Sequence, residues 1–198
     1  MRIEYSIQKL RGKKTLIIGD LATGKTKLTA KLLGEAVQKG LSSKVTAIDM
    51  APPRFSIKGQ QAGGLLENFT PSTKQVRYLK VVGIKAPRLM ARNPEELLLL
   101  ARSNQDLIDK CLKNYLENPS EILFINDVSI YLQTGHADRI IKVMSLAETS
   151  VANGYYGEKL AKDMTTNISK HEREGMDRLV NSVEIVIHLE VETCPYQN

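Results

Sequence analysis

The feature that most constrains this chain is the eight-residue segment Gly19–Thr26, which has the spacing Gly-x-x-x-x-Gly-Lys-Thr. It follows a short, continuously apolar run, Thr15–Gly19, which is typical of a strand covered on both faces of a sheet. Apolar residues then recur at helical spacing from Gly24 to Lys39, and Gly40 supplies a left-handed stop. The segment is therefore expected to join a buried strand directly to the start of a helix.

The residue types in this segment suit the binding of a phosphate group. The two glycines let backbone N–H groups close around an anion, and the N-terminus of the following helix adds its dipole. Lys25 is expected to reach the β- and γ-phosphates of a nucleotide, and the Thr26 hydroxyl to bind Mg²⁺. A plain glycine turn, the alternative, would need neither side chain. The predicted nucleotide-binding residues are Gly19, Asp20, Leu21, Ala22, Thr23, Gly24, Lys25 and Thr26.

The motif ends at Thr26, so the next residue, Lys27, is not assigned to the nucleotide site.

Apolar runs alternate with helical stretches along the rest of the chain. This order is typical of a layered α/β sheet, and no repeat, low-complexity tract or long linker marks a domain boundary. We therefore predict one domain over residues 1–198, with a three-layer α/β fold and a mainly parallel central sheet. Tyr155–Ile168 has no assignable pattern. Strands are predicted at Val45–Ile48, Tyr78–Val82, Ile122–Ile125, Thr149–Ala152 and Val183–Val191, and helices from Asn93 towards Pro119, at Ala137–Ala147 and from Ser169 to Val180.

An acidic residue after the most apolar strand is a candidate metal ligand. The run Ile122–Ile125 is expected to be central in the sheet, and Asn126 and Asp127 follow it directly. In a nucleotide-binding sheet, an acid at this place meets Mg²⁺ either directly or through water. Asp127 is therefore predicted as a metal partner. The alternative is a turn acid that caps the strand end.

Together, these two motifs resemble the Walker A and Walker B elements of the P-loop NTPase superfamily. The resemblance implies a P-loop fold that binds Mg²⁺ and a nucleoside triphosphate. Val128 follows Asp127 where many ATP-driven motors carry a water-activating glutamate, which disfavours a motor or translocase. ATP is favoured over GTP because no Asn/Thr-Lys-x-Asp guanine-reading motif follows the late strands. Asn153 stands near that place and is a candidate contact to base or phosphate, although Asn-Gly is also a favoured turn.

The passage from Ile48 to Arg54, and on through Gln60 and Gln61, resembles the region after strand two in signal-recognition-particle GTPases and their dimeric ATPase relatives. In that group an acid at this place orients or activates the attacking water, and nearby side chains touch the γ-phosphate or a second subunit. The resemblance implies a catalytic role for Asp49, a weaker one for Arg54, and a homodimer. The Lys-rich Walker A variant of those ATPases is absent here. A buried cap or turn acid is the competing interpretation of Asp49.

Positive charge is concentrated in the first half of the chain. Residues 1–100 hold 18 Lys+Arg and 7 Asp+Glu, a net +11, whereas residues 101–198 hold 10 and 15, a net −5. No acid occurs from Asn68 to Pro94. This stretch could bind a nucleic-acid backbone or the phosphates of a second substrate; the alternative, favoured by the low aromatic content, is a strand edge protected by lysines. Its basic residues are Lys74, Arg77, Lys80, Lys85, Arg88 and Arg92, interleaved with Phe69 and Tyr78.

Arg173 lies near the start of the helix predicted from Ser169 to Val180. A mobile arginine there could stabilise charge on a transferred phosphoryl group, either in the same chain or across a subunit boundary. Exposed helix-surface charge is the alternative interpretation.

Cysteine content and apolar patterning exclude several classes of protein. Two cysteines, Cys111 and Cys194, are too few for a disulfide-dense secreted scaffold or a four-cysteine zinc site. The N-terminal residues lack the pattern of a signal peptide, a charged segment followed by an apolar one. The apolar runs are too short to cross a bilayer. We expect a soluble, cytoplasmic protein with no membrane partner.

The sequence thus predicts a magnesium-dependent ATPase, with Lys25, Asp49 and Asp127 as the residues of the reaction. Two alternatives stay open. One is a kinase that moves the γ-phosphate to a small molecule or a polynucleotide end, and the other is a nucleotide-gated module that binds a protein or nucleic acid.

Overall fold

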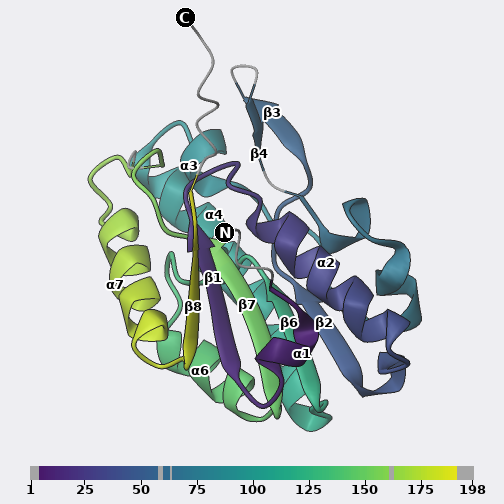
Figure 1. Ribbon diagram of the computed structural model, residues 1–198. Helices are drawn as coiled ribbons and strands as arrows, with labels where there is room; N and C mark the ends of the chain where they lie inside the picture. The colour runs from purple at the N-terminus through teal and green to yellow at the C-terminus, as the bar shows by residue number, and fades with distance from the viewer. Residues whose placement is uncertain (1–4, 58–59, 63, 161–162, 191–198) are drawn as a thin grey trace, which may run out of the picture.

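The central feature of the fold is a sheet of six strands in the order β5-β2-β6-β7-β1-β8, with every neighbouring pair parallel (Figure 1). The computed structural model describes residues 5–57, 60–62, 64–160 and 163–190. The predicted α/β class and parallel sheet are confirmed. The strands are β1 (Lys14–Gly19), β2 (Val45–Asp49), β5 (Arg77–Lys80), β6 (Ile122–Asn126), β7 (Thr149–Tyr155) and β8 (Ile185–Leu189).

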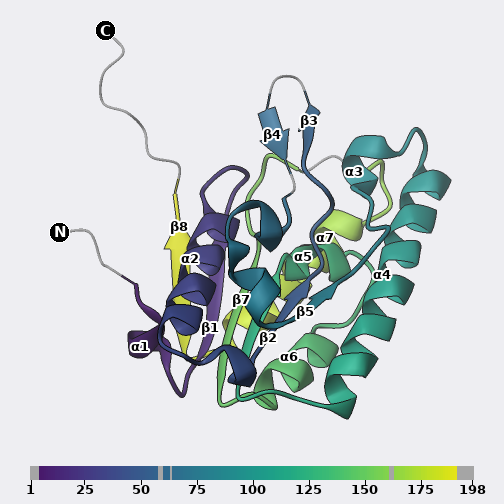
Figure 2. The same cartoon turned by 90° about the vertical axis from the view of Figure 1, so that its right-hand side faces the viewer.

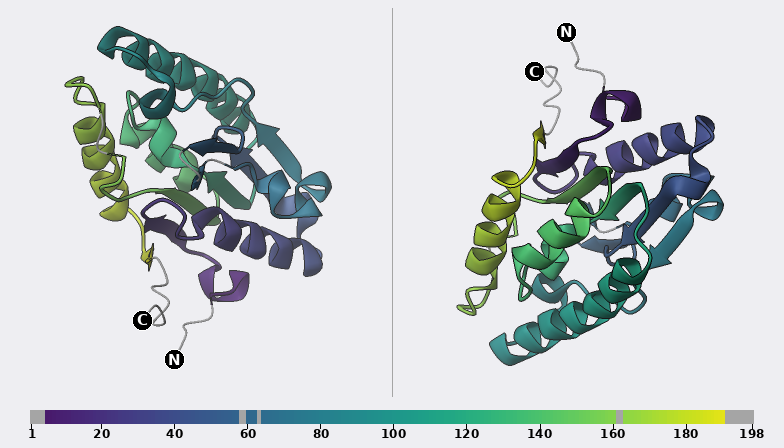
Figure 3. Two further views of the ribbon diagram at one scale, coloured as in Figure 1. Left: turned by 90° about the horizontal axis from the view of Figure 1, so that it is seen from above. Right: turned by 90° about the horizontal axis from the view of Figure 1, so that it is seen from below.

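Helices cover both faces of the sheet and make three layers (Figure 3). One face carries α1 (Ile7–Leu10) and α2 (Lys25–Gln38). The opposite face carries α4 (Pro94–Glu117), α5 (Val128–Tyr131), α6 (Ala137–Ser145) and α7 (Ile168–Val180), with the short α3 (Pro87–Met90) beside α4. A 3-10 turn, Ser42–Lys44, leads from α2 into β2, and two more, Leu66–Asn68 and Pro71–Gln75, precede β5. A hairpin of β3 (Phe55–Ile57) and β4 (Gln60–Ala62) stands apart from the sheet (Figure 2).

The strands are apolar without interruption because alternate side chains enter two separate cores. Ile17 and Phe124 pack among the residues of α1 and α2, whereas Leu16 and Ile125 pack among those of α4 to α7. All four are essentially inaccessible to solvent. A strand covered on both faces has no polar side to display, which is what the sequence pattern indicated.

Local signals at the helix ends agree with the structure at α4 and differ at α7. Helix α4 starts where the sequence places it: the Asn93 side chain accepts a hydrogen bond from Glu96 N at 2.8 Å, and Pro94 takes the first helical position. Helix α7 begins at Ile168, one residue before the predicted start, and its N-cap is Asn167. The Ser-x-x-Glu spacing of Ser169 and Glu172 is typical of a capping box, but none forms here, because the Glu172 carboxylate pairs with an arginine of α3.

Other boundaries move by a few residues. Strand β7 continues to Tyr155, three residues beyond the prediction, and β5 ends at Lys80, two residues short of it. Val191 of the predicted last strand and Cys194 lie outside the described residues. Among the helices of the described ranges, none is both long and apolar enough to cross a membrane.

Helix α4 gives a direct test of the layered core, because two of its leucines differ only in environment. Leu112 is fully buried, whereas Leu99 is 68% exposed. Leu112→Ala should lower the free energy of unfolding by about 2–5 kcal/mol, since it removes buried apolar surface and leaves a cavity. Leu99→Ala, the matched control, should change it by less than about 0.5 kcal/mol in the same urea titration. Equal losses in the two variants would contradict the burial of this helix face.

Candidate functional site

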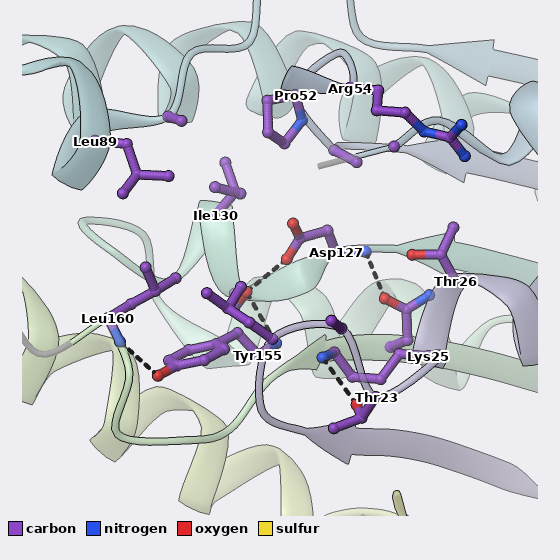
Figure 4. Close-up of a pocket in the computed structure, with 18 of the residues that line it drawn as sticks. Thr23, Lys25, Thr26, Pro52, Arg54, Leu89, Asp127, Ile130, Tyr155 and Leu160 are labelled. Carbon is purple, nitrogen blue, oxygen red and sulfur yellow. Dashed lines mark hydrogen bonds between the residues drawn. The ribbon is translucent and has the colours of Figure 1, made fainter. Parts of the chain in front are cut away.

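A cavity of about 470 Å³ opens beyond the carboxyl ends of the parallel strands (Figure 4). Its walls come from the loop between β1 and α2, the segment after β2, the short helices α3 and α5, and residues of β7 and α7. Ligands of open α/β sheets bind at this edge, and the volume suits a small molecule. The cavity is therefore the candidate site.

The β1–α2 loop forms one wall and needs both of its glycines. A Cβ on Gly19 would lie 2.3 Å from the carbonyl oxygen of Leu189, so only glycine fits against β8. Gly24 has φ +90°, a conformation that side chains disfavour. The residues from Leu21 to Thr26, which were predicted to bind a nucleotide, all line the cavity. Gly19 and Asp20 lie at the base of the loop and are not part of the cavity wall.

The wall formed by α2 extends one residue beyond the predicted motif. Lys27 also lines the cavity, although the sequence left it outside the nucleotide site, and it is exposed to solvent. The motif pattern ends at Thr26 and so gave no signal for this residue. Lys27 adds a solvated positive charge at the cavity, next to the more buried Lys25.

Lys25, the first residue of α2, directs its ammonium group into this loop. Its Nζ donates to Gly19 O at 2.9 Å and to Asp20 O at 2.5 Å. It also donates to Thr23 Oγ1 at 3.4 Å (Figure 4). Burial lowers the pKa of Lys25, an effect that the charges of Asp127 and Asp20 oppose. The structure thus holds a partly desolvated cation at the cavity wall, where an anion would compete for it.

Asp127 and Thr26 line the same cavity from two different elements (Figure 4). Asp127 follows β6 in a left-handed conformation (φ 64°), and its carboxylate accepts a hydrogen bond from Ser129 Oγ at 2.5 Å. Burial raises the pKa of Asp127, while the Ser129 hydrogen bond and the charge of Lys25 act in the opposite direction.

The oxygens of Thr26 and Asp127 fit one kind of metal site. Within the described residues, no three or more His, Cys, Asp or Glu side chains gather as a ready-made metal cage. Mg²⁺ is usually bound through one or two protein oxygens, with substrate phosphates and water completing the octahedron. A hydroxyl and a carboxylate that line the same cavity are compatible with that mode of binding.

Asn153 on β7 lines the cavity, but all of its amide groups are engaged inside the protein. Its Nδ2 donates to Thr29 Oγ1 at 2.8 Å and to Asn126 Oδ1 at 2.9 Å. Its Oδ1 accepts from the backbone N of Asp127 at 3.1 Å. The side chain therefore fixes α2, β6 and the Asp127 turn relative to one another. The structure gives it no free polar atom for the base or phosphate contact that was predicted.

Asp49 lies outside the cavity wall and is fully buried. Its carboxylate accepts hydrogen bonds from Leu66 N at 2.6 Å, Tyr78 Oη at 2.7 Å and Asn126 Nδ2 at 2.8 Å, with Ala51 N further away at 3.3 Å. Burial raises the pKa of Asp49, and these donors partly offset the rise. This geometry matches the second interpretation, that of a buried acid which anchors the turn after its strand.

Polar residues that the sequence did not assign to the nucleotide site also line the cavity from elements other than α2, among them Arg88 of α3, Gln133 after α5, and Glu172 of α7. Arg88 and Glu172 form a two-point ion pair, with Nη2–Oε2 at 2.9 Å and Nη1–Oε1 at 3.2 Å. Their side chains are 4% and 5% exposed. The pair is separated by 84 residues in the chain, so no local spacing could have revealed it.

The basic stretch over residues 68–94 does not form one exposed surface. Arg88 is buried against Glu172, Arg77 donates to the Asn114 side chain and to carbonyl oxygens at the end of α4, and Lys80 pairs with Glu67 at 3.0 Å. Half of its six cations are thus engaged in contacts within the chain.

Two more arginines stack on aromatic rings. The Arg54 guanidinium lies 5.0 Å from the centre of the Phe69 ring, and both residues line the cavity. Arg173 lies 3.9 Å from the centre of the Tyr156 ring, on the wall of a neighbouring cavity. Both contacts are within the usual range of cation–π interactions.

Comparison with known proteins gives no family assignment. No protein-family model matches the chain, and no curated protein matches it. Among solved structures, a protein of Pyrococcus horikoshii OT3, described only as the object of a structural study, is 11% identical. The match covers 94% of this chain and 88% of that one, with a TM-score of 0.46. This distant likeness bears on neither the fold nor the function.

Asn153 can be tested as the connection between the cavity walls. Asn153→Ala should lower the free energy of unfolding by about 1–3 kcal/mol, because it leaves buried groups of Thr29 and Asn126 without their partner. Asn181→Ala, at the exposed end of α7, is the control and should cost less than about 0.5 kcal/mol. Both are measured by urea unfolding. A loss no larger in Asn153→Ala than in the control would show that the amide is dispensable.

Proposed function

We propose that this protein binds Mg²⁺–ATP in the cavity and hydrolyses the γ-phosphate. One observation carries the proposal: Lys25 and Thr26 at the start of α2, and Asp127 from the turn after β6, line a single cavity at the carboxyl edge of the sheet. A cation, a hydroxyl and a carboxylate are the protein groups that a metal-bound triphosphate requires.

The start of α2 supports binding of the phosphate chain. This helix has 14 residues, no side-chain cap at its N-terminus and no acid in its first turn. The first N–H groups of such a helix lack intrahelical partners, and its dipole favours an anion. Lys25 would exchange its contacts to Gly19 and Asp20 carbonyls for phosphate oxygens. Binding is therefore expected to need little movement of the backbone.

The metal would be held by the Thr26 hydroxyl and the Asp127 carboxylate, together with oxygens of the nucleotide. Once bound, it neutralises charge on the β- and γ-phosphates. The protein's own contribution is positioning: Lys25 binds the phosphates, and Asn153 and Ser129 fix the Asp127 turn. Fixed charges and aligned donors supply most of the acceleration in phosphoryl transfer. Asp49 takes part here as an anchor of the turn after β2.

A second candidate, a kinase, is favoured by a neighbouring cavity of about 370 Å³. The two cavities share Arg88, Tyr155, Leu160 and Glu172. An acceptor hydroxyl bound in the second cavity would approach the γ-phosphate from that side. ATP consumption that accelerates only with an added acceptor would identify a kinase. Negligible turnover with tight, nucleotide-dependent partner binding would instead identify a nucleotide-gated module.

Lys25→Ala should weaken ATP binding by at least about 100-fold and abolish turnover. The substitution removes the ammonium group that, among the described residues, is directed into the β1–α2 loop. Lys31→Ala is the matched control: Lys31 lies further along α2, pairs with Glu35 and is absent from the cavity wall. Binding is measured by calorimetry with a non-hydrolysable ATP analogue, and GTP is titrated alongside. Unchanged affinity in Lys25→Ala would refute the proposal.

Asp127→Asn should raise the Mg²⁺ concentration needed for half-maximal turnover by about tenfold or more, because a neutral amide replaces a charged ligand. Asp106→Asn, on the exposed surface of α4, makes the same chemical change away from the cavity and should leave the magnesium requirement unaltered. The measurement is a magnesium titration of phosphate release at saturating ATP. An identical titration curve for both variants would remove Asp127 from the metal site.

A further inference from the structure

The cavity contains a second charged cluster, which has no part in the proposed binding of the phosphates and the metal. Arg88 and Glu172 are paired and buried; the charge of Arg88 acts on Asp127, and the charge of Asp127 acts on Glu172. Burial is the largest effect on both carboxyl groups and raises the pKa of Asp127 and of Glu172. In addition, the charge of Arg88 lowers the pKa of Asp127, and the charge of Asp127 raises the pKa of Glu172. The pair therefore lies close to the carboxylate that is proposed to hold the metal.

Hydrolysis needs a group that orients water and takes its proton, and few described residues are placed for this. Of the described residues, two carboxylates line the cavity, Asp127 and Glu172. Asp127 is assigned to the metal, and Asp49 does not reach the wall. Among the described residues of the cavity wall, Glu172 is thus the carboxylate available to accept a proton from water.

Two buried polar atoms beside Glu172 have no hydrogen-bond partner within the described structure: Arg88 Nε and Gln133 Oε1. Both residues line the cavity, and both are at most 6% exposed. Buried polar atoms are rarely left unpaired without a reason. Water that enters the cavity would satisfy both atoms, and the Gln133 side chain also hydrogen-bonds the Glu172 carboxylate.

Glu172 and Arg88 also line the neighbouring cavity, so the pair stands on the wall common to both. A nucleophile that comes from the second cavity towards the phosphates would pass this pair. Position and charge therefore single out Arg88 and Glu172, and the unsatisfied atoms lie on Arg88 and on Gln133.

We propose that Glu172 is the catalytic base of the ATP hydrolysis, with Arg88 and Gln133 as the residues that position it and the attacking water. This inference rests on the proposed function. The Glu172 carboxylate accepts a proton from water as the water oxygen forms a bond to the γ-phosphorus. The bond from that phosphorus to the β,γ-bridging oxygen breaks, and ADP leaves with the electron pair. Phosphate is released, and Glu172 returns its proton to solvent.

The environment of Glu172 suits this role near neutral pH. Burial raises the pKa of Glu172 to about 7, against the opposing effect of Arg88. The groups that face it are Arg88 from α3, Gln133 from the segment after α5, Asp127 after β6 and Tyr155 of β7. A base with a pKa near the working pH combines a large ionised fraction with good proton affinity.

The test compares Glu172→Gln with Glu174→Gln, which makes the same change two residues along α7. Glu174 is exposed and pairs loosely with Lys170 at 3.9 Å. Glu172→Gln should lower kcat by about 100-fold or more and leave the affinity for a non-hydrolysable ATP analogue within about threefold of wild type. Glu174→Gln should match wild type in both measurements.

Because Glu172→Gln leaves Arg88 without a buried counter-ion and could fail to fold, Glu172→Asp serves as a second variant that keeps the charge. Shortening the side chain should lower kcat by at least about tenfold with analogue binding retained. In the wild-type protein, kcat should rise with pH through the pKa of Glu172, since only the ionised form accepts a proton. Folded Glu172→Gln should lack this rise.

Three results would overturn the proposal: kcat within about threefold of wild type in either folded Glu172 variant, a pH profile of Glu172→Gln that keeps the acidic limb, or a wild-type kcat that is flat between about pH 5.5 and 8.5. In each of these cases wild-type protein still binds and hydrolyses ATP, so the proposed function survives. Wild-type protein that binds no nucleotide would refute the proposed function itself.

Discussion

The arrangement of the cavity depends on one chain of buried hydrogen bonds across the carboxyl edge of the sheet. It runs from Thr29 of α2 through Asn153 of β7 and Asn126 of β6 to Asp49 of β2, and ends at Tyr78 of β5. Each step joins neighbouring elements at 2.7–2.9 Å. Buried polar groups of this kind are costly when unpaired and directional when paired, so the chain fixes the relative position of its elements. The backbones of Lys25 and Asp127 are both joined to the α2 end of this chain, through Thr29 and Asn153 respectively.

The charges that the cavity withdraws from solvent are balanced. Lys25 and Arg88 supply two cations, and Asp127 and Glu172 supply two anions. Burial opposes the charged form of Lys25, Asp127 and Glu172 alike, while their oppositely charged neighbours favour it. Such a balance is easily changed by an incoming charged ligand, because electrostatic interactions are strong where water is excluded. A metal–nucleotide complex would therefore shift the protonation of groups on both sides of the cavity.

Local sequence patterns predicted the parts of the molecule that are themselves local. The β1–loop–α2 unit follows from an apolar run, two glycines and a helical period, and the place of Asp127 follows from the most apolar strand. The same patterns could not show which way a strand-end side chain turns. Asp49 is the last residue of β2 and Asp127 directly follows β6, yet the first is bound by donors from Leu66, Tyr78 and Asn126, and the second faces the cavity. The pairing of Arg88 with Glu172 depends on the meeting of α3 and α7, which only the complete fold determines.

The order of the strands has a consequence for the width of the site. β7 lies between β1, which leads into the loop of Lys25, and β6, which leads to Asp127. Neighbouring strands are about 4.8 Å apart, so the two walls begin roughly 10 Å from each other. The strand between them, β7, contributes Asn153 and Tyr155 to the cavity. The span between the lysine and the aspartate is therefore a property of the backbone, and substitutions of side chains on the walls should leave it unchanged.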